Sequence, residues 1–107
     1  MSRLDQTFKA LADPTRRAIL ARLAKGDAVV GELASPFAMT WPAVTKHLKV
    51  LEGAGLIKQV REGNSRRCQL VAKPMCEARD WIDHYEAFWS DRLNALSKYL
   101  AVEHKRK

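Results

Sequence analysis

The chain has 107 residues, of which 47% are hydrophobic and 29% charged, and 19 lysines and arginines against 12 aspartates and glutamates give a net charge of +7. This composition excludes an intrinsically disordered chain, a collagen-like chain and a disulfide scaffold. The longest uncharged stretch, residues 33–45, is shorter than the roughly 20 apolar residues of a membrane span, and the N-terminus lacks a secretory signal pattern. We therefore expect one small cytoplasmic domain with no membrane partner.

Three short helices are predicted in the first third of the chain. The first covers residues 4–12, where apolar residues recur at i, i+4 and i+7. The second begins with the pair Asp13-Pro14, an N-cap followed by a proline at the first helical position, and ends at Gly26. The third covers residues 29–35 and is stopped by the proline that follows.

A fourth helix is predicted from the N-cap Thr40 to the glycines at 53 and 55. Val44, Leu48 and Leu51 recur at i, i+4 and i+7, so they form its buried stripe. The opposite, outward side then carries Trp41, Pro42, Thr45, Lys46 and Lys49.

A β-hairpin follows this helix. Two extended runs, residues 58–62 and 65–71, flank Gly63-Asn64, a pair that accepts positive φ and so suits a tight turn. Arginines crowd the turn. Residues 41–75 carry seven basic and two acidic side chains, against six and four in residues 1–40, and six and six in the remainder. This charge could neutralise phosphates, or it could be a solvated basic face.

The last predicted element is one long helix from Met75 to Val102. Its apolar side chains recur at spacings of three and four, which gives a wide aromatic stripe. A small monomer could not leave such a stripe in water, so we expect a homodimer in which the first helix joins the last. The expected interface consists of Leu4, Phe8, Trp81, Ile82, Tyr85, Phe88, Trp89, Leu93, Leu96 and Leu100.

The order of elements predicts a winged helix-turn-helix, a mainly α fold with a small β-hairpin wing. One α-helix fits into a DNA major groove about 12 Å wide, and arginines at a hairpin tip can reach the neighbouring backbone or minor groove. We expect this domain to span residues 1–103, followed by a basic tail at 104–107.

Four segments resemble the ArsR family of bacterial winged-helix repressors. They are FKALADPTRRAIL at 8–20, GELA at 31–34, VTKHLKVLEGAGLI at 44–57 and REG at 61–63. The motifs follow the family's order and spacing over residues 4–100, which makes the resemblance specific. It implies a homodimer that binds an inverted-repeat operator and blocks transcription.

The resemblance also implies which residues contact DNA. Family members read bases with the start and middle of the fourth helix. Trp41 could stack on DNA or fold back onto Phe37 and Met39, and His47 could contact a phosphate or make a structural hydrogen bond. Arg66 and Arg67 point to opposite faces of their strand. The expected contacts are Thr40, Trp41, Pro42, Thr45, Lys46, His47, Lys49, Arg61, Asn64, Arg66 and Arg67.

Metal binding, common in this family, is not expected here. The family's cysteine site falls on residues 32–37, which hold no cysteine, and the later half of its C-terminal helix site has no histidine. Cys76, Asp80 and His84 share a helix face, but positions eight apart are about 12 Å apart along the axis, too far for one zinc ion. We expect no metal and no cofactor, and the effector, if any, is unknown.

Three further interpretations concern catalysis, the cysteines and an alternative function. The sequence holds no nucleophile elbow, phosphate-binding glycine loop or paired carboxylates, so we expect no enzyme. Cys68 and Cys76 are expected to be buried or half-buried thiols rather than a redox switch. The alternative function is a winged-helix module that binds a protein instead of DNA, which would lack the strong salt dependence of DNA binding.

Overall fold

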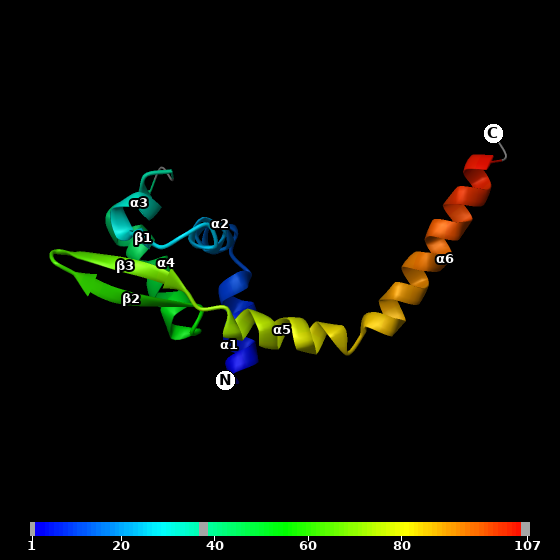
Figure 1. Cartoon of the computed structure of the whole chain (residues 1–107), viewed down its shortest axis with the longest axis horizontal. Helices are drawn as coiled ribbons and strands as arrows, with labels where there is room; N and C mark the ends of the chain where they lie inside the picture. Colours follow the sequence, from blue (N-terminus) through cyan, green and yellow to red (C-terminus); the bar gives the residue numbers. More distant parts are fainter. Residues whose placement is uncertain (1, 37–38, 106–107) are drawn as a thin grey trace.

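The computed structural model describes residues 2–36 and 39–105. Its elements in chain order are α1 (Arg3–Leu11), α2 (Pro14–Leu23), β1 (Ala28–Val29), α3 (Val30–Ala34), α4 (Trp41–Gly53), β2 (Ile57–Glu62), β3 (Ser65–Leu70), α5 (Lys73–Asp83) and α6 (Glu86–Lys105). The first four helices and the sheet pack together, α5 leads away from them, and α6 projects beyond it (Figure 1). The predicted mainly α fold with a hairpin wing is confirmed.

The first helix, α1, begins with a capping box. The Asp5 backbone N–H donates to Ser2 Oγ at 3.1 Å, and the Ser2 N–H donates to an Asp5 carboxylate oxygen at 3.4 Å. Two otherwise unpaired amides are thereby satisfied, which fixes the start of the helix. The helix ends at Leu11, beside the predicted end at Ala12.

The second helix starts as predicted. The Asp13 side chain accepts the Arg16 backbone N–H at 3.0 Å, and Pro14 occupies the first turn, where its missing N–H costs nothing. The helix ends at Leu23, and Gly26, the residue predicted to close it, lies just beyond the C-cap with the expected positive φ, +149°.

The prediction for residue 29 was wrong. Val29 belongs to the short strand β1, which pairs with β3, and α3 begins only at the next residue. Val29 is the N-cap residue of α3. Its backbone N–H donates to a Glu32 carboxylate oxygen at 3.2 Å, so a side chain of the first turn satisfies this amide. A strand of two residues is too short to show alternation in a sequence.

The sheet is antiparallel with the order β1-β3-β2, so β3 is its central strand. Its hairpin register pairs Glu62 with Ser65 beside the turn, as the two predicted runs require, and reaches Ile57 opposite Leu70. Strand β2 thus begins one residue earlier than its predicted run, and β3 ends one residue earlier than its own. At the turn Gly63 takes φ of +61°, whereas Asn64 keeps a negative φ. Only the first residue of the turn therefore uses the left-handed region, which is why glycine is needed there.

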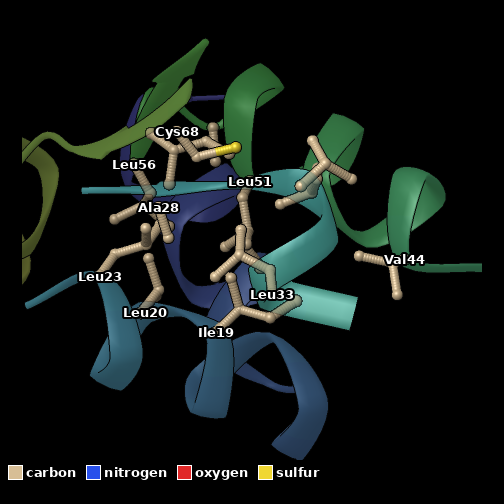
Figure 2. Close-up of a cluster of buried hydrophobic side chains, with 14 residues drawn as sticks. Ile19, Leu20, Leu23, Ala28, Leu33, Val44, Leu51, Leu56 and Cys68 are labelled. Atoms are coloured by element: carbon tan, nitrogen blue, oxygen red, sulfur yellow. The ribbon is translucent and has the colours of Figure 1, made fainter. Parts of the chain in front are cut away.

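The core lies between α2, α3, α4 and the sheet (Figure 2). The predicted stripe of α4 is confirmed, since Val44 and Leu51 are fully buried and Leu48 is 1% exposed. Against it pack Ile19 from α2 and Leu33 from α3, both fully buried. This packing holds one side of α4 inside and leaves the other side to solvent.

The predicted single C-terminal helix is wrong, because α5 and α6 are separated at His84 and Tyr85. The His84 ring N–H donates to the Asp80 carbonyl at 2.8 Å, and the backbone N–H groups of residues 84 and 85 donate to the carbonyls of Trp81 and Ile82, three residues back. In a continuous helix the His84 backbone N–H would donate to the Asp80 carbonyl. Here the side chain bonds to that carbonyl, and the backbone forms tighter hydrogen bonds to residues three positions back.

The end of α6 does not coincide with the predicted domain boundary. The helix runs through residue 104 to Lys105, and the last two residues of the predicted tail lie outside the described part of the chain. The domain limits therefore stay a prediction. Within the described residues, no helix is both long and apolar enough to cross a membrane.

Candidate nucleic-acid interface

The outward side of α4 carries the polar residues predicted for it. Thr40 accepts the Ala43 backbone N–H on its hydroxyl at 3.3 Å and so caps the helix. Lys46 and Lys49 are exposed, and Thr45 is half-buried, with its hydroxyl donating to the Trp41 carbonyl at 3.0 Å. The helix thus presents two exposed ammonium groups, and the Thr45 hydroxyl, which donates within the helix, can still accept a hydrogen bond from an outside partner.

Trp41 lies at the start of α4 with 58% of its surface exposed. Its ring packs on Gly31 of α3, where an added Cβ would lie 3.4 Å from the ring. Of the two predicted surroundings, Met39 is partly buried against the core, and Phe37 is outside the described residues. The absence of a side chain at Gly31 lets the indole approach α3 closely, while more than half of the Trp41 surface stays open to a ligand.

A cleft of about 430 Å³ separates α4 from the wing, which is the hairpin of β2 and β3. Its lining residues are Val30, Gly31, Trp41, Thr45, Leu48, Lys49, Glu52, Gln59, Asn64, Ser65 and Arg66. The cleft brings five of the predicted DNA-binding residues together, from both the helix and the wing. Sequence reasoning missed Gln59 and Ser65, although strand alternation places Gln59 on the same face as Arg61.

The wing arginines differ in their surroundings. Arg67 forms an ion pair with Glu62, with Nε 2.6 Å from a carboxylate oxygen and a second hydrogen bond at 3.3 Å. The Arg67 guanidinium lowers the pKa of Glu62, and Glu62 raises the pKa of Arg67. Arg66 lies directly opposite Arg61 in the hairpin register, and it points to the opposite strand face from Arg67, as predicted.

His47 makes contacts inside the helix-turn-helix. Its Nδ1 lies 3.5 Å from Nη1 of Arg16 and 3.8 Å from a carboxylate oxygen of Asp13. Arg16 also donates to the α1 carbonyls of Ala10 at 2.7 Å and Lys9 at 3.0 Å. These contacts favour the structural alternative for His47, and its contact with a phosphate stays a prediction.

The pair of arginines after Asp13 is a feature that the sequence analysis did not interpret. Arg16 bonds to carbonyls near the end of α1, and Arg17 donates to the Leu11 carbonyl at 2.7 Å. Both side chains thus satisfy acceptors that a helix end leaves without partners. The signal was present as two adjacent cations at the start of the next helix, but a turn of unknown geometry separates them from α1.

Acid should weaken the cap of α2. The Arg16 backbone N–H holds the pKa of Asp13 below its ordinary value of 3.8, so the ionised carboxylate stabilises the folded state above that pH. This contribution is lost as the pH falls from 3.8 through the lowered pKa of the folded chain. We expect Asp13→Asn, which keeps an acceptor oxygen, to unfold with less pH dependence in that range than the parent. Urea unfolding at several pH values measures this, and identical pH profiles would contradict it.

The predicted interface residues of the last helix are solvent-exposed in the single chain. Phe8 and Trp81 make an edge-to-face contact at 5.5 Å, and Trp81 continues to Tyr85 at 5.3 Å, so α1 and α5 share an aromatic cluster. Beyond it α6 exposes 61% of Phe88 and 55% of Leu93. The other exposed apolar residues of α5 and α6 are Ile82, Trp89, Leu96, Tyr99, Leu100 and Val102, of which Tyr99 and Val102 were not predicted.

The two cysteines have different environments. Cys68 is fully buried on β3, and burial raises the pKa of its thiol, as expected for an inert packing residue. Cys76 is exposed on α5, so the expectation of a buried or half-buried thiol was wrong for it. In the described part of the chain, no three His, Cys, Asp or Glu side chains gather in a way that could hold a metal ion.

Known proteins similar to this chain are transcriptional regulators. Residues 11–60 match a family described as a helix-turn-helix domain. An HTH-type transcriptional regulator of Mycobacterium tuberculosis, Rv2034, is 39% identical over 99 residues, which cover 92% of this chain and 90% of that protein. The transcriptional repressor SdpR of Bacillus subtilis is 33% identical over 79 residues, covering 74% of this chain and 88% of SdpR.

Solved structures agree with these relatives. A crystal structure of an ArsR family transcriptional regulator superposes with a TM-score of 0.78 at 40% identity, covering 83% of this chain and 98% of that one. The predicted class of DNA-binding regulator is thereby confirmed, and the relatives named here are regulators rather than enzymes. The chain belongs to the ArsR family of winged helix-turn-helix transcriptional regulators.

Proposed function

We propose that the protein is a homodimeric repressor that binds an inverted-repeat operator, with α4 in the major groove and the wing on the adjacent backbone or minor groove. The observation that carries this proposal is the cleft between α4 and the wing, because Thr45 and Lys49 of the helix face Asn64 and Arg66 of the hairpin across it. A DNA strand separates a major groove from the neighbouring minor groove, so a helix and a wing can contact its two sides. The likeness to a repressor supports the direction of regulation.

The proposed dimer rests on the apolar surface of α5 and α6. Isolated apolar side chains are ordinary on protein surfaces, but here they follow one another along two consecutive helices. A second copy of the chain offers the same surface, so a two-fold axis would bury both stripes against each other. The half-buried Leu4 and Phe8 of α1 lie beside this surface and extend it.

The proposed reading surface predicts a defined change in sequence preference. We expect Lys46→Ala to reduce the ratio of operator to random-DNA affinity, because a bidentate base contact contributes about 1–3 kcal/mol of discrimination. Lys25→Ala is the matched control, since this exposed lysine follows α2 and lies away from the cleft lining. DNA sites selected from a random pool, followed by binding titrations on the selected site, measure the ratio.

The selected sites also test the dimer geometry. Two reading helices related by a two-fold axis reach half-sites about one duplex turn apart, near 34–36 Å, or a multiple of that spacing. Selected sites without dyad symmetry would contradict the proposal. Absence of a salt-dependent affinity for any duplex would favour the alternative of a protein-binding module.

A further inference from the structure

Two arginines face each other across the wing. Arg61 and Arg66 are directly opposed partners in the register of β2 and β3, so their side chains leave the sheet on the same face. Like charges in this position destabilise a hairpin. Within residues 2–36 and 39–105, neither guanidinium forms an ion pair with a carboxylate, and the side-chain hydrogen bond of Arg61 to the Gly63 carbonyl is long, at 3.5 Å.

The opposite face of the same hairpin is neutralised. Successive side chains of a strand alternate between faces, so Glu62 and Arg67 lie on the side away from the arginine pair. Their ion pair is short, at 2.6 Å, and Asp27 and Glu32 add negative potential around Arg67. The wing therefore has one face on which positive charge is balanced by acids and one face on which it is not.

The unbalanced face is the one beside the cleft. Arg66 lines the cleft together with Asn64 at the turn and Lys49 of α4, which bring amide and ammonium donors. Gln59, two residues before Arg61 and on the same strand face, also lines it. An anion at the mouth of the cleft would meet donors from both the wing and α4, with Glu52 as the acid among the lining residues.

We propose that Arg61 and Arg66 form a clamp that binds a single phosphate of the DNA backbone between their two guanidinium groups, while Arg67 stays with Glu62 and contacts no DNA. This inference rests on the proposed function and gives the wing residues separate roles. Guanidinium groups match the geometry of phosphate oxygens, and an anion placed between two of them converts their repulsion into attraction. Both Arg66 and Arg67 are expected from the sequence to contact DNA, and of these two the clamp assigns that contact to Arg66 alone.

Salt dependence of operator binding distinguishes one shared phosphate from two separate ones. The logarithmic slope of affinity against salt changes by about 0.9 for each phosphate neutralised on B-DNA. If the phosphate is shared, Arg61→Gln or Arg66→Gln alone should change the slope little, since one guanidinium still neutralises it. The double variant should lower the slope by about 0.9 per subunit and weaken binding about tenfold or more at low salt. Additive losses of slope in the two single variants would overturn the clamp.

Arg67→Gln is the matched control. This variant should keep the salt slope of the parent, and it should melt at a lower temperature because it breaks the ion pair with Glu62. Arg66→Gln should melt at the same or a higher temperature than the parent, because it removes a like-charge pair. A loss of slope in Arg67→Gln equal to that of the double variant would overturn the proposed division of the wing.

A duplex with single phosphates replaced by uncharged methylphosphonates locates the contact. One such position in each half-site should weaken binding of the parent but leave binding of the Arg61→Gln and Arg66→Gln double variant unchanged. If the parent binds the operator and no position behaves in this way, the clamp is wrong while the proposed function stands. If the parent binds no duplex at any salt concentration, the proposed function itself has failed.

Discussion

A chain with both Leu93 and Leu96 replaced by glutamate is expected to be a folded monomer that has lost most of its operator affinity. The two leucines lie one turn apart on α6 and are 55% and 52% exposed in the single chain, so their replacement does not disturb the core around α4. In a dimer the four introduced carboxylates would be buried without partners, which strongly opposes association. Sedimentation should then show the monomer mass, and circular dichroism should show the helix content retained.

The loss of affinity follows from the loss of bivalency. Two linked reading heads gain about 10²-fold to 10⁴-fold in affinity over one, so we expect operator binding to fall by at least about a hundredfold. Asn94→Glu with Ser97→Glu is the matched control, because it adds the same charge on α6 without removing apolar surface. A leucine double variant that remains dimeric at micromolar concentration, or a parent protein that is monomeric there, would show that another surface joins the subunits.

Leu48→Ala is expected to destabilise the whole domain. Leu48 is 1% exposed and lies on the stripe that attaches the reading helix to the core, so its truncation removes apolar contacts and leaves a cavity. Substitutions of this kind cost about 2–5 kcal/mol, which for a domain of this size lowers the melting temperature by about 10 °C or more. Thermal and urea unfolding of the purified protein measure both quantities.

Val50→Ala provides the comparison on the same helix. Val50 is 40% exposed, so its truncation should change the free energy of unfolding by no more than about 0.5 kcal/mol. The Leu48 variant should bind the operator with nearly parental affinity at temperatures where it is fully folded. The Leu48 side chain is buried and contacts no DNA, so it affects binding only by holding α4 in place. Equal stability of the two variants would mean that the stripe does not anchor the helix.

The elements that sequence patterns predicted well are those with local chemical signals. The Asp13-Pro14 pair fixes the start of α2, and the spacing of Val44 and Leu51 identifies the buried side of α4. Each signal comes from residues within one or two turns, where helix geometry alone decides which side chains meet. For the same reason the sequence predicts which residues of α4 lie on its outward side.

Elements that depend on tertiary contacts were missed. The break between α5 and α6 coincides with a side-chain hydrogen bond of His84 to the Asp80 carbonyl, and no glycine or proline marks it in the sequence. The pairing of β1 with β3 joins residues about forty positions apart, and a strand of two residues is too short to give a sequence pattern that predicts it. The neutralisation of Arg67 by Glu62 likewise required the register of the hairpin, since composition alone counts both arginines as free cations.

One side chain joins the two working surfaces of the molecule. Arg16 donates to carbonyls near the end of α1, on the side proposed for dimerisation, and its guanidinium also contacts His47 on α4. The connection between α1 and α4 therefore passes through the hydrogen bonds of one side chain. The spacing of two reading helices in the proposed dimer therefore depends on how α1, α5 and α6 of the two subunits meet, so the geometry of the subunit interface determines which half-site spacing the protein can bind.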